Sequence, residues 1–339
     1  MLQFALFGAG RIGRMHADNL GLSERARLAH VYDVDTQAAD ETAERHGANS
    51  ARSVEEALAD NDVAAVLIAS STDTHVELIA AAVAAGKAVL CEKPIDLDIA
   101  RVEACRQVVE DSGVPVQIGF NRRYDPTHRA VQRAVRDGEV GAVEQVIITS
   151  RDPSLAPVEY LRVSGGLFRD MMIHDFDLAR FMLGEEPVEI SAFGSVMVDP
   201  QLRDMGDVDT AMVLMRTESG ALCHISNSRR AVYGYDQRVE VFGAKGMVRS
   251  DNRRATDIER YTQAGTATRD PLMPFFIERY PEAYVDELND FIDAVEQGRE
   301  PSITFEDGHR ALILADAANE ALRTGRSVEI RYQAARTGN

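Results

Sequence analysis

The sequence predicts an α/β domain with a doubly wound parallel sheet, followed by an α+β domain with a large, mostly antiparallel sheet. A glycine-rich turn lies between the apolar run Leu2–Phe7 and a helical segment, as in a βαβ unit. Strand-like and helical runs then alternate up to residue 120, which indicates parallel strands with right-handed crossovers. After residue 187, strand-like runs follow one another with only turns between them, which indicates antiparallel pairing.

The first domain is expected to span residues 1–120. Its strands are predicted at Leu2–Phe7, Leu28–Tyr32, Val63–Ile68, Ala88–Cys91 and Val116–Phe120. Its helices are predicted at Ile12–Leu20, Thr36–His46, Thr74–Ala85 and Asp98–Ser112, with a further one after the capping box Ser53–Glu56. Glycine directly follows several of these helices, as it commonly does at helix ends.

The second domain is expected to span residues 121–333. Its helices are predicted at Pro126–Arg136, Gly166–Leu183, Pro281–Gln297 and Phe305–Arg323. Its strands are predicted at Val143–Thr149, Val188–Val198, Thr210–Arg216, Ala221–Ser228, Gln237–Phe242 and Gly246–Arg249. The turns Thr217–Gly220 and Gly243–Gly246 are typical of hairpin connections.

Composition excludes several classes of function. The 339 residues carry a formal net charge of −18, which argues against nucleic-acid binding because phosphates require a basic patch. The three cysteines lie far apart, favouring reduced thiols over disulfides or a zinc site. No apolar run is long enough to span a membrane, and we expect no signal peptide because the first strand begins at residue 2. We therefore expect a cytoplasmic protein.

The glycine turn predicts a dinucleotide site. Gly8, Gly10 and Gly13 have the G-x-G-x-x-G spacing between a strand and a helix. Gly8 allows the tight turn, Gly10 lets the backbone approach a pyrophosphate, and Gly13 lets the helix lie close to the strand. The N–H groups at the helix N-terminus attract phosphates. The alternative, a turn that binds nothing, leaves the complete order of strand, glycines, helix, strand and acid unexplained.

Asp33 predicts the choice of cofactor. It ends the second strand-like run, about 20 residues after the last glycine, where a carboxylate binds the adenosine ribose hydroxyls. A 2′-phosphate would meet this carboxylate with like charge, and no arginine follows at Val34 or Asp35. The sequence therefore predicts NAD rather than NADP.

Two further loops follow strands of the predicted parallel sheet, at the edge where such sheets bind ligands. The hydroxyls of Ser70–Thr74 could line a cofactor, and His75 begins a helix; the alternative is helix capping, and both can hold together. Lys93, within Glu92–Lys93–Pro94, is placed to face a nicotinamide. The alternative is a solvated lysine, which its place between a buried strand and a proline disfavours.

Asp170 and His174 form a third candidate. On one continuous helix they are i, i+4 neighbours, with Asp177 one turn further on, and an Asp can orient an imidazole base. On spacing alone, an exposed Asp–His pair of little consequence is the favoured interpretation. No metal site is predicted, because no H-E-x-x-H motif or third ligand is evident.

Four motifs together resemble the Gfo/Idh/MocA oxidoreductases: Gly8–Gly13, Glu92–Lys93–Pro94, Arg122–Asp125 and the D-x-x-x-H-D of 170–175. The glycine motif is shared by many families, whereas Glu-Lys-Pro followed by D-x-x-x-H is far more specific. The resemblance covers nearly the whole chain. It implies a Rossmann domain, a large-sheet domain that shapes the substrate pocket and builds a homotetramer, and oxidation of a ring hydroxyl of a cyclic polyol or sugar with hydride transfer to NAD.

The resemblance also implies site residues. The catalytic residues would be Lys93, Asp170 and His174, with a cis peptide bond between Lys93 and Pro94. The cofactor would be held by Gly8, Ala9, Gly10, Arg11, Ile12, Gly13, Asp33, Ser71, Thr72, His75, Glu92 and Lys93, although Ser71-Thr72 departs from the Pro-Thr or Thr-Pro of many members. The substrate would be held by Lys93, Arg123, Asp152, Asp170, His174, Asp177 and Tyr235, with Tyr233 as an alternative to Tyr235.

The expected pocket suits a polyol. Its Asp, Arg, His, Lys and Tyr side chains can be satisfied by hydroxyls that donate and accept at once, and the chain has no tryptophan. A large apolar substrate would leave these groups without partners. Two other functions stay open: an NAD-dependent glycoside hydrolase that yields no net NADH, and a non-catalytic sensor of NAD and a sugar.

Overall fold

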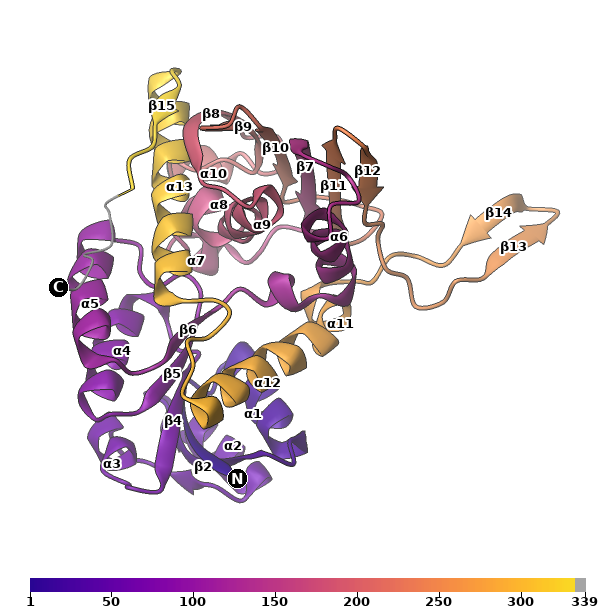
Figure 1. Ribbon diagram of the computed structural model, residues 1–339. Coiled ribbons are helices and arrows are strands. Elements are labelled where there is room, and N and C mark those ends of the chain that lie inside the picture. The colour runs from indigo at the N-terminus through magenta and orange to yellow at the C-terminus, as the bar shows by residue number, and fades with distance from the viewer. Residues whose placement is uncertain (333–339) are drawn as a thin grey trace. The chain divides into compact units, whose positions relative to one another are not determined.

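The computed structural model describes residues 1–332, which form two compact units (Figure 1). The first unit contains Met1–Tyr124 and Glu282–Leu312, and the second contains Asp125–Pro281 and the described residues from Ile313 onwards. Residues 282–312, assigned from the sequence to the second domain, thus pack with the first. Residue 333, the last of the predicted second domain, lies outside the described residues.

The first unit is built on a six-stranded parallel sheet. Its strand order is β3-β2-β1-β4-β5-β6. The order of the strands along the chain reverses between β1 and β4, and ligands bind to doubly wound sheets at such a switch point. The strands are β1 (Leu2–Phe7), β2 (Ala26–Tyr32), β3 (Asn49–Ser50), β4 (Val63–Ile68), β5 (Ala88–Glu92) and β6 (Val116–Gly119). The apolar runs predicted as strands are therefore strands, and β3 is an additional short one.

Helices cover this sheet and complete its core. They are α1 (Arg11–Leu22), α2 (Thr36–His46), α3 (Val54–Leu58), η1 (Thr72–Thr74), α4 (His75–Ala84), α5 (Ile99–Ser112), η2 (Asn121–Tyr124) and α12 (Pro281–Gln297). Helix α12 belongs here because Leu288, Phe291 and Ile292 pack into the core of the sheet. The ring of Phe291 lies 5.9 Å from that of Phe4 on β1.

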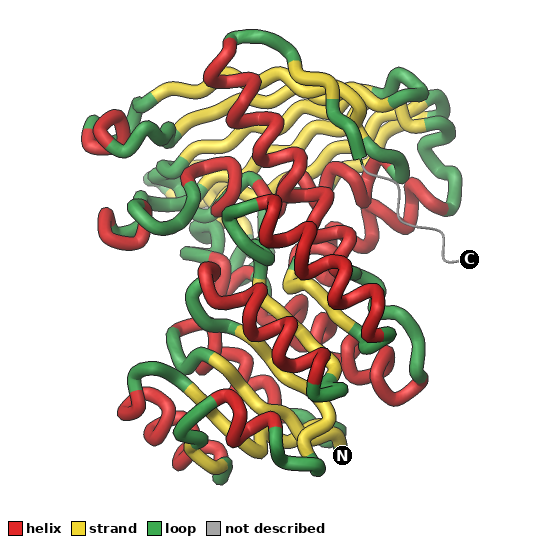
Figure 2. Tube along the Cα trace, turned by 90° about the vertical axis from the view of Figure 1, so that its left-hand side faces the viewer, coloured by secondary structure: helices red, strands yellow, loops and turns green. Residues whose placement is uncertain are grey.

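The second unit is built on a seven-stranded mixed sheet, whose strands lie side by side in Figure 2. Its order is β12-β11-β7-β10-β9-β8-β15, and its neighbours are antiparallel except for the parallel pair β7 and β10. The strands are β7 (Val143–Arg151), β8 (Pro187–Ser195), β9 (Thr210–Thr217), β10 (Leu222–Ser228), β11 (Asp236–Gly243), β12 (Gly246–Arg249) and β15 (Val328–Glu329). Both predicted hairpins, β9–β10 and β11–β12, are present.

A separate hairpin of β13 (Glu259–Thr262) and β14 (Gly265–Arg269) was not expected from the sequence and extends away from the sheet of this unit (Figure 1). The helices of the unit are α6 (Pro126–Arg136), α7 (Val158–Leu161), α8 (Gly166–Asp170), α9 (Ile173–Leu183), α10 (Gln201–Asp204) and α11 (Phe276–Arg279), and α13 (Phe305–Thr324) continues into it.

The seven-stranded sheet has one packed face and one open face. Alternate residues of its strands, such as Val213 and Ile225, join Phe168, Phe176 and Leu314 of the helices in one core. The opposite face carries large apolar side chains that are 42–75% exposed, namely Phe193, Met212, Leu214, Leu222 and Phe242. A group of large exposed apolar side chains on one face of a sheet is characteristic of an interaction surface.

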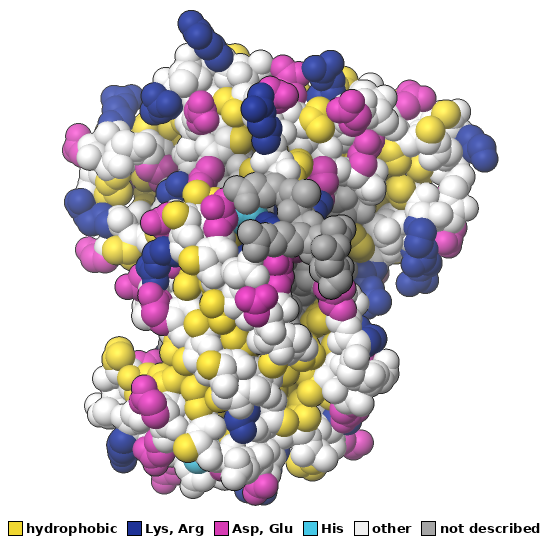
Figure 3. Space-filling model, turned by 60° about the vertical axis from the view of Figure 1, so that its left-hand side comes forward, with side chains coloured by type: hydrophobic (Ala, Val, Ile, Leu, Met, Phe, Trp, Pro, Cys, Tyr) yellow, Lys and Arg dark blue, Asp and Glu magenta, His cyan; other side chains and the backbone are white. Residues whose placement is uncertain are grey.

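Two further observations concern the expectation that the protein binds neither nucleic acid nor a membrane. On the face drawn in Figure 3, acidic and basic side chains are interspersed rather than gathered by charge. Among the described residues, no helix combines the length and apolarity that crossing a bilayer requires.

Candidate functional site

The glycine turn after β1 is shaped by close backbone packing. Gly8 has φ +101°, and a Cβ there would lie 2.5 Å from the backbone of Ala69 and Ser70 in the loop after β4. A Cβ on Gly13 would overlap the carbonyl oxygen of Gly8. Gly10, by contrast, has no atom within 4 Å of the Cβ position, and as the N-cap of α1 it offers no side chain to the first helical N–H groups. An open helix N-terminus with this backbone access fits a pyrophosphate.

Asp33 supports this turn as well as facing the expected ribose position. One carboxylate oxygen accepts the N–H of Ala9 at 2.6 Å, and the other accepts the N–H of Asp35 at 2.8 Å. Carboxylate oxygens have further lone pairs, so ribose hydroxyls can still bind. The residues that carry the dinucleotide prediction therefore lie together at the carboxyl ends of β1 and β2.

Ser71, Thr72 and His75 follow β4, with Thr72 in the short helix η1 and His75 at the start of α4. Ser71 is exposed and Thr72 half-buried, whereas the His75 ring is buried and turned into the protein. Its Nδ1 lies 2.8 Å from the oxygen of Pro94 and its Nε2 lies 3.2 Å from the oxygen of Ser70. Burial lowers the pKa of His75 although both carbonyls favour the charged form. A neutral ring has one N–H, and the shorter contact indicates donation to Pro94.

The turn after β5 carries Lys93. The Lys93–Pro94 peptide bond is cis, as predicted. Lys93 is half-buried, and Glu92 before it points to His16, with 2.9 Å between Oε1 and Nε2. Because His75 binds the carbonyl of Pro94, the loops after β4 and β5 are tied together beside Lys93.

Asp170 and His174 lie in the second unit, on a segment whose structure differs from the prediction. The predicted helix Gly166–Leu183 is two helices, α8 and α9, because the N–H of Met172 bonds the oxygen of Leu167 five residues back, at 2.9 Å. Asp170 ends the first helix and His174 lies in the first turn of the second. The i, i+4 geometry of one continuous helix is therefore wrong here.

Arg229 is a functional candidate that does not belong to the site residues predicted from the sequence. Its guanidinium is 2% exposed, and its two terminal nitrogens lie 3.1 and 3.2 Å from Oδ2 of Asp170. The hydroxyl of Tyr160 donates to Oδ1 of Asp170 at 2.6 Å. A buried arginine requires an acidic partner. The sequence does not identify this partner, because Asp170 and Arg229 are 59 residues apart.

The predicted substrate residues differ in surroundings. Arg123 lies in the first unit and pairs with Asp307 at 2.9 Å, and Asp152 is half-buried after β7. Asp177 on α9 is 1% exposed. Tyr235 is 4% exposed and packs edge-on against Phe275.

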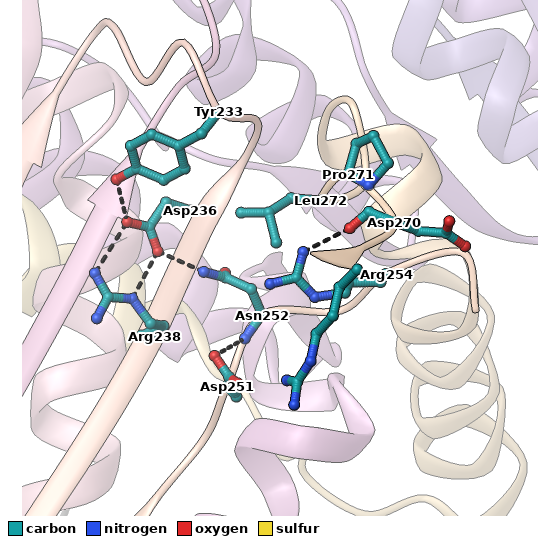
Figure 4. A pocket seen from close by; sticks show the side chains of 10 residues that line it. Tyr233, Asp236, Arg238, Asp251, Asn252, Arg254, Asp270, Pro271 and Leu272 are labelled. Carbon is teal, nitrogen blue, oxygen red and sulfur yellow. Dashed lines mark hydrogen bonds and ion pairs between the residues drawn. The ribbon is translucent and has the colours of Figure 1, made fainter. Parts of the chain in front are cut away.

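Tyr233 lines a cleft of about 500 Å³ in the second unit (Figure 4). Its hydroxyl donates to Asp236 at 2.6 Å, and Asp236 also accepts from Arg238 and Asn252. Although burial opposes ionisation, these hydrogen bonds lower the pKa of Asp236. The polar groups around Asp236 thus satisfy one another, and of the predicted site residues only the alternative Tyr233 lines this cleft.

Two family models match the chain. One, described as "Oxidoreductase family, NAD-binding Rossmann fold", matches residues 2–120, and the other, "GFO/IDH/MocA C-terminal domain", matches residues 128–249. The chain therefore belongs to the Gfo/Idh/MocA family of oxidoreductases, and its first unit contains the NAD-binding Rossmann fold. The predicted family, fold class and cofactor are confirmed.

Similar proteins match over nearly their whole length. "Inositol 2-dehydrogenase" of Rhizobium meliloti is 49% identical, covering 97% of this chain and 99% of its own. "Myo-inositol 2-dehydrogenase" of Thermotoga maritima is 44% identical, covering 97% and 98%. The crystal structure of a myo-inositol dehydrogenase from Corynebacterium glutamicum has a TM-score of 0.94, 43% identity and coverage of 98% and 100%. The crystal structure of scyllo-inositol dehydrogenase from Lactobacillus casei, with bound NAD(H) and scyllo-inositol, has a TM-score of 0.90 and 29% identity. It covers 97% of this chain and 99% of its own.

Proposed function

We propose that this protein oxidises a ring hydroxyl of an inositol with NAD, converting myo-inositol to 2-keto-myo-inositol. The observation that carries the proposal is the near full-length likeness, at 44–49% identity, to proteins named for this activity. The presence of Lys93, Asp170 and His174 in the family's pattern supports a working enzyme over a sensor.

Each catalytic residue has a proposed role. NAD, when bound, supplies the acceptor for the hydride of the carbinol carbon. His174 takes the hydroxyl proton as general base. Lys93 donates a hydrogen bond to the reacting oxygen and stabilises the negative charge that develops there. Asp170, held by Tyr160 and Arg229, orients His174 and offsets its positive charge.

The cofactor is proposed to lie along Gly8–Gly13 and Asp33, with Ser71, Thr72, Glu92 and Lys93 beside it. His75 would act indirectly, since both ring nitrogens face backbone carbonyls. Arg123, Asp152, Asp177 and Tyr235 are proposed substrate residues. Of these four residues, Arg123 and Asp152 are the ones we expect to contact the substrate directly, because Asp177 and Tyr235 are almost fully buried.

The substrate proposal is tested by NADH absorbance after mixing protein and NAD with myo-, scyllo- and chiro-inositol, glucose and a nitrophenyl glycoside. We expect NADH with myo-inositol. NADH with scyllo-inositol alone would favour the isomer named for the Lactobacillus casei structure. Release of nitrophenol without NADH would replace the proposal by the glycoside hydrolase.

We further propose a homotetramer that works in the cytoplasm. The exposed apolar face of the seven-stranded sheet supports assembly, because water contact with so many large side chains is unfavourable. All three cysteines are buried free thiols, which suits a reducing compartment.

A further inference from the structure

The first unit contains a largely buried cluster of ionisable side chains that includes Glu92, the residue before Lys93. His16 comes from α1, Glu92 ends β5, and Glu287 comes from α12. One nitrogen or oxygen atom of each lies within 4.8 Å of the others. His16 is 1% exposed and Glu287 is 0% exposed.

The bonds within this cluster are incomplete. Nε2 of His16 and Oε1 of Glu92 are 2.9 Å apart. Both carboxyl oxygens of Glu287 lack a hydrogen-bond partner among the described residues. So does Oε1 of Gln117, whose Nε2 donates to the backbone oxygen of Glu287 at 3.1 Å.

Burial and the charges around Glu287 make an ionised carboxylate there very unfavourable. Burial comes first, and Glu92 and Asp290 add negative charge; together they raise the pKa of Glu287 well above its ordinary value. Asp290 is itself paired with Arg299 and Tyr124. The titratable groups that face Glu287 are Glu92 from β5, His16 from α1, Tyr124 from η2 and Asp290 from its own helix.

Resting on the proposed role of Lys93, we propose that Glu287 is a positioning residue that carries a proton and shares it with the carboxylate of Glu92. The separation suits a direct hydrogen bond after a small side-chain rotation, or one bridging water. Glu287 then donates to Glu92, and His16 donates to the same carboxylate. This chain of hydrogen bonds holds Glu92 in place, and Glu92 holds the backbone that presents Lys93.

Three variants test this positioning role. E287Q mimics the protonated acid in shape and charge, E287L removes every polar atom, and E296Q is the matched control because Glu296 is on the same helix and pairs at the surface with Arg25. We expect E287Q and E296Q to keep the kcat of the parent enzyme. We expect E287L to bind NAD normally but to lose roughly tenfold in kcat, since Glu92 loses a partner. A kcat for E287Q as low as that of E287L would overturn the proposal.

Two measurements on the full chain need no substrate and so remain informative if no inositol is oxidised. Infrared spectroscopy of the parent enzyme at neutral pH should show the carbonyl stretch of a buried protonated carboxyl, and this band should vanish in E287Q. Relative to E287Q, the folding equilibrium constant of the parent should fall by about tenfold per pH unit as the pH rises from 4.5 toward the raised pKa of Glu287, because over this range only the unfolded chain releases the proton. Absence of the band, or a stoichiometric metal ion in the purified protein, would refute the protonated Glu287.

Discussion

At the scale of single residues, Arg229 is the buried cation that binds the carboxylate of Asp170. Its guanidinium is buried and both terminal nitrogens converge on one oxygen of Asp170. Lysine cannot reproduce this forked contact. We expect R229K to lower kcat/KM roughly tenfold while the Kd for NAD is unchanged, because a hydrogen bond to a charged group contributes about 1.5–3 kcal/mol.

The neighbouring Arg230 provides the control for this prediction. It is exposed and donates to the oxygen of Met197 at 3.3 Å. R230K should therefore leave kcat/KM unchanged in the same steady-state assay. Equal effects of the two substitutions on kcat/KM would show that Arg229 has no specific role in the site.

Asp33 governs the choice between NAD and NADP. Its charge opposes a 2′-phosphate, while its oxygen also accepts the N–H of Ala9. Asparagine keeps one acceptor oxygen for the N–H of Ala9, but it loses the charge and the second acceptor, which binds the N–H of Asp35. D33N should thus retain the fold, by circular dichroism, and narrow the ratio of kcat/KM for NAD over NADP by at least about tenfold. Comparable values for both cofactors in the parent enzyme would contradict this assignment.

At the scale of elements, the β1–α1 turn contains one glycine that the fold requires, Gly13, and one that the fold does not require, Gly10. A Cβ at Gly13 collides with the backbone of Gly8, whereas one at Gly10 meets nothing within 4 Å. G13A should destabilise the protein by about 1–3 kcal/mol, and G10A by less than about 0.5 kcal/mol. Denaturant unfolding measures both.

The same pair should differ in cofactor binding. G10A is expected to weaken NAD binding in titration calorimetry although its stability is nearly normal, because the added methyl group stands where a pyrophosphate would approach the backbone. Normal NAD affinity in G10A would show that this position does not face the cofactor.

Helix α13 begins with a carboxylate whose ionisation stabilises the fold. Burial opposes ionisation of Glu306, but hydrogen bonds from His309 and Arg310 prevail and lower its pKa from 4.5 to about 2. Since the folded-state pKa is the lower one, this stabilisation is complete above pH 4.5 and is lost as the pH falls toward 2. E306Q should be less stable by about 1–2 kcal/mol at neutral pH after allowance for solvent screening.

A pH series of unfolding curves checks the sign of this effect. The difference between the parent protein and E306Q should shrink as the pH falls from 4.5 toward 2. A difference that is constant over this range would mean that packing, rather than charge, accounts for the loss.

Local signals explain which elements the sequence could predict. The glycine turn, the hairpins β9–β10 and β11–β12, and the bounds of α12 depend on neighbouring residues, and they are present in the structure. The break between α8 and α9 falls at Met171 and Met172, which are good helix formers, so nothing local announces it. The orientation of His75 and the contact of Arg229 with Asp170 depend on residues distant in the chain, which periodicity cannot pair.

At the scale of the whole molecule, the open face of the seven-stranded sheet calls for a partner. Met212 and Leu214 lie two residues apart on β9, and Phe193 is paired with Met212 across β8 and β9. The three side chains are 75%, 54% and 56% exposed for Phe193, Met212 and Leu214 respectively. A charge placed among them should prevent two such faces from packing together, because an unpaired charge in an apolar interface is costly.

We therefore expect L214K to dissociate the proposed tetramer. Light scattering coupled to size exclusion should give four times the chain mass for the parent protein and a smaller multiple for L214K, with a lower and concentration-dependent Tm. V34K is the control, because Val34 is 89% exposed in the first unit and receives the same substitution. If L214K keeps the parent mass, the tetramer is not assembled through this face; if the parent protein is itself a monomer, the exposed apolar side chains serve a different partner.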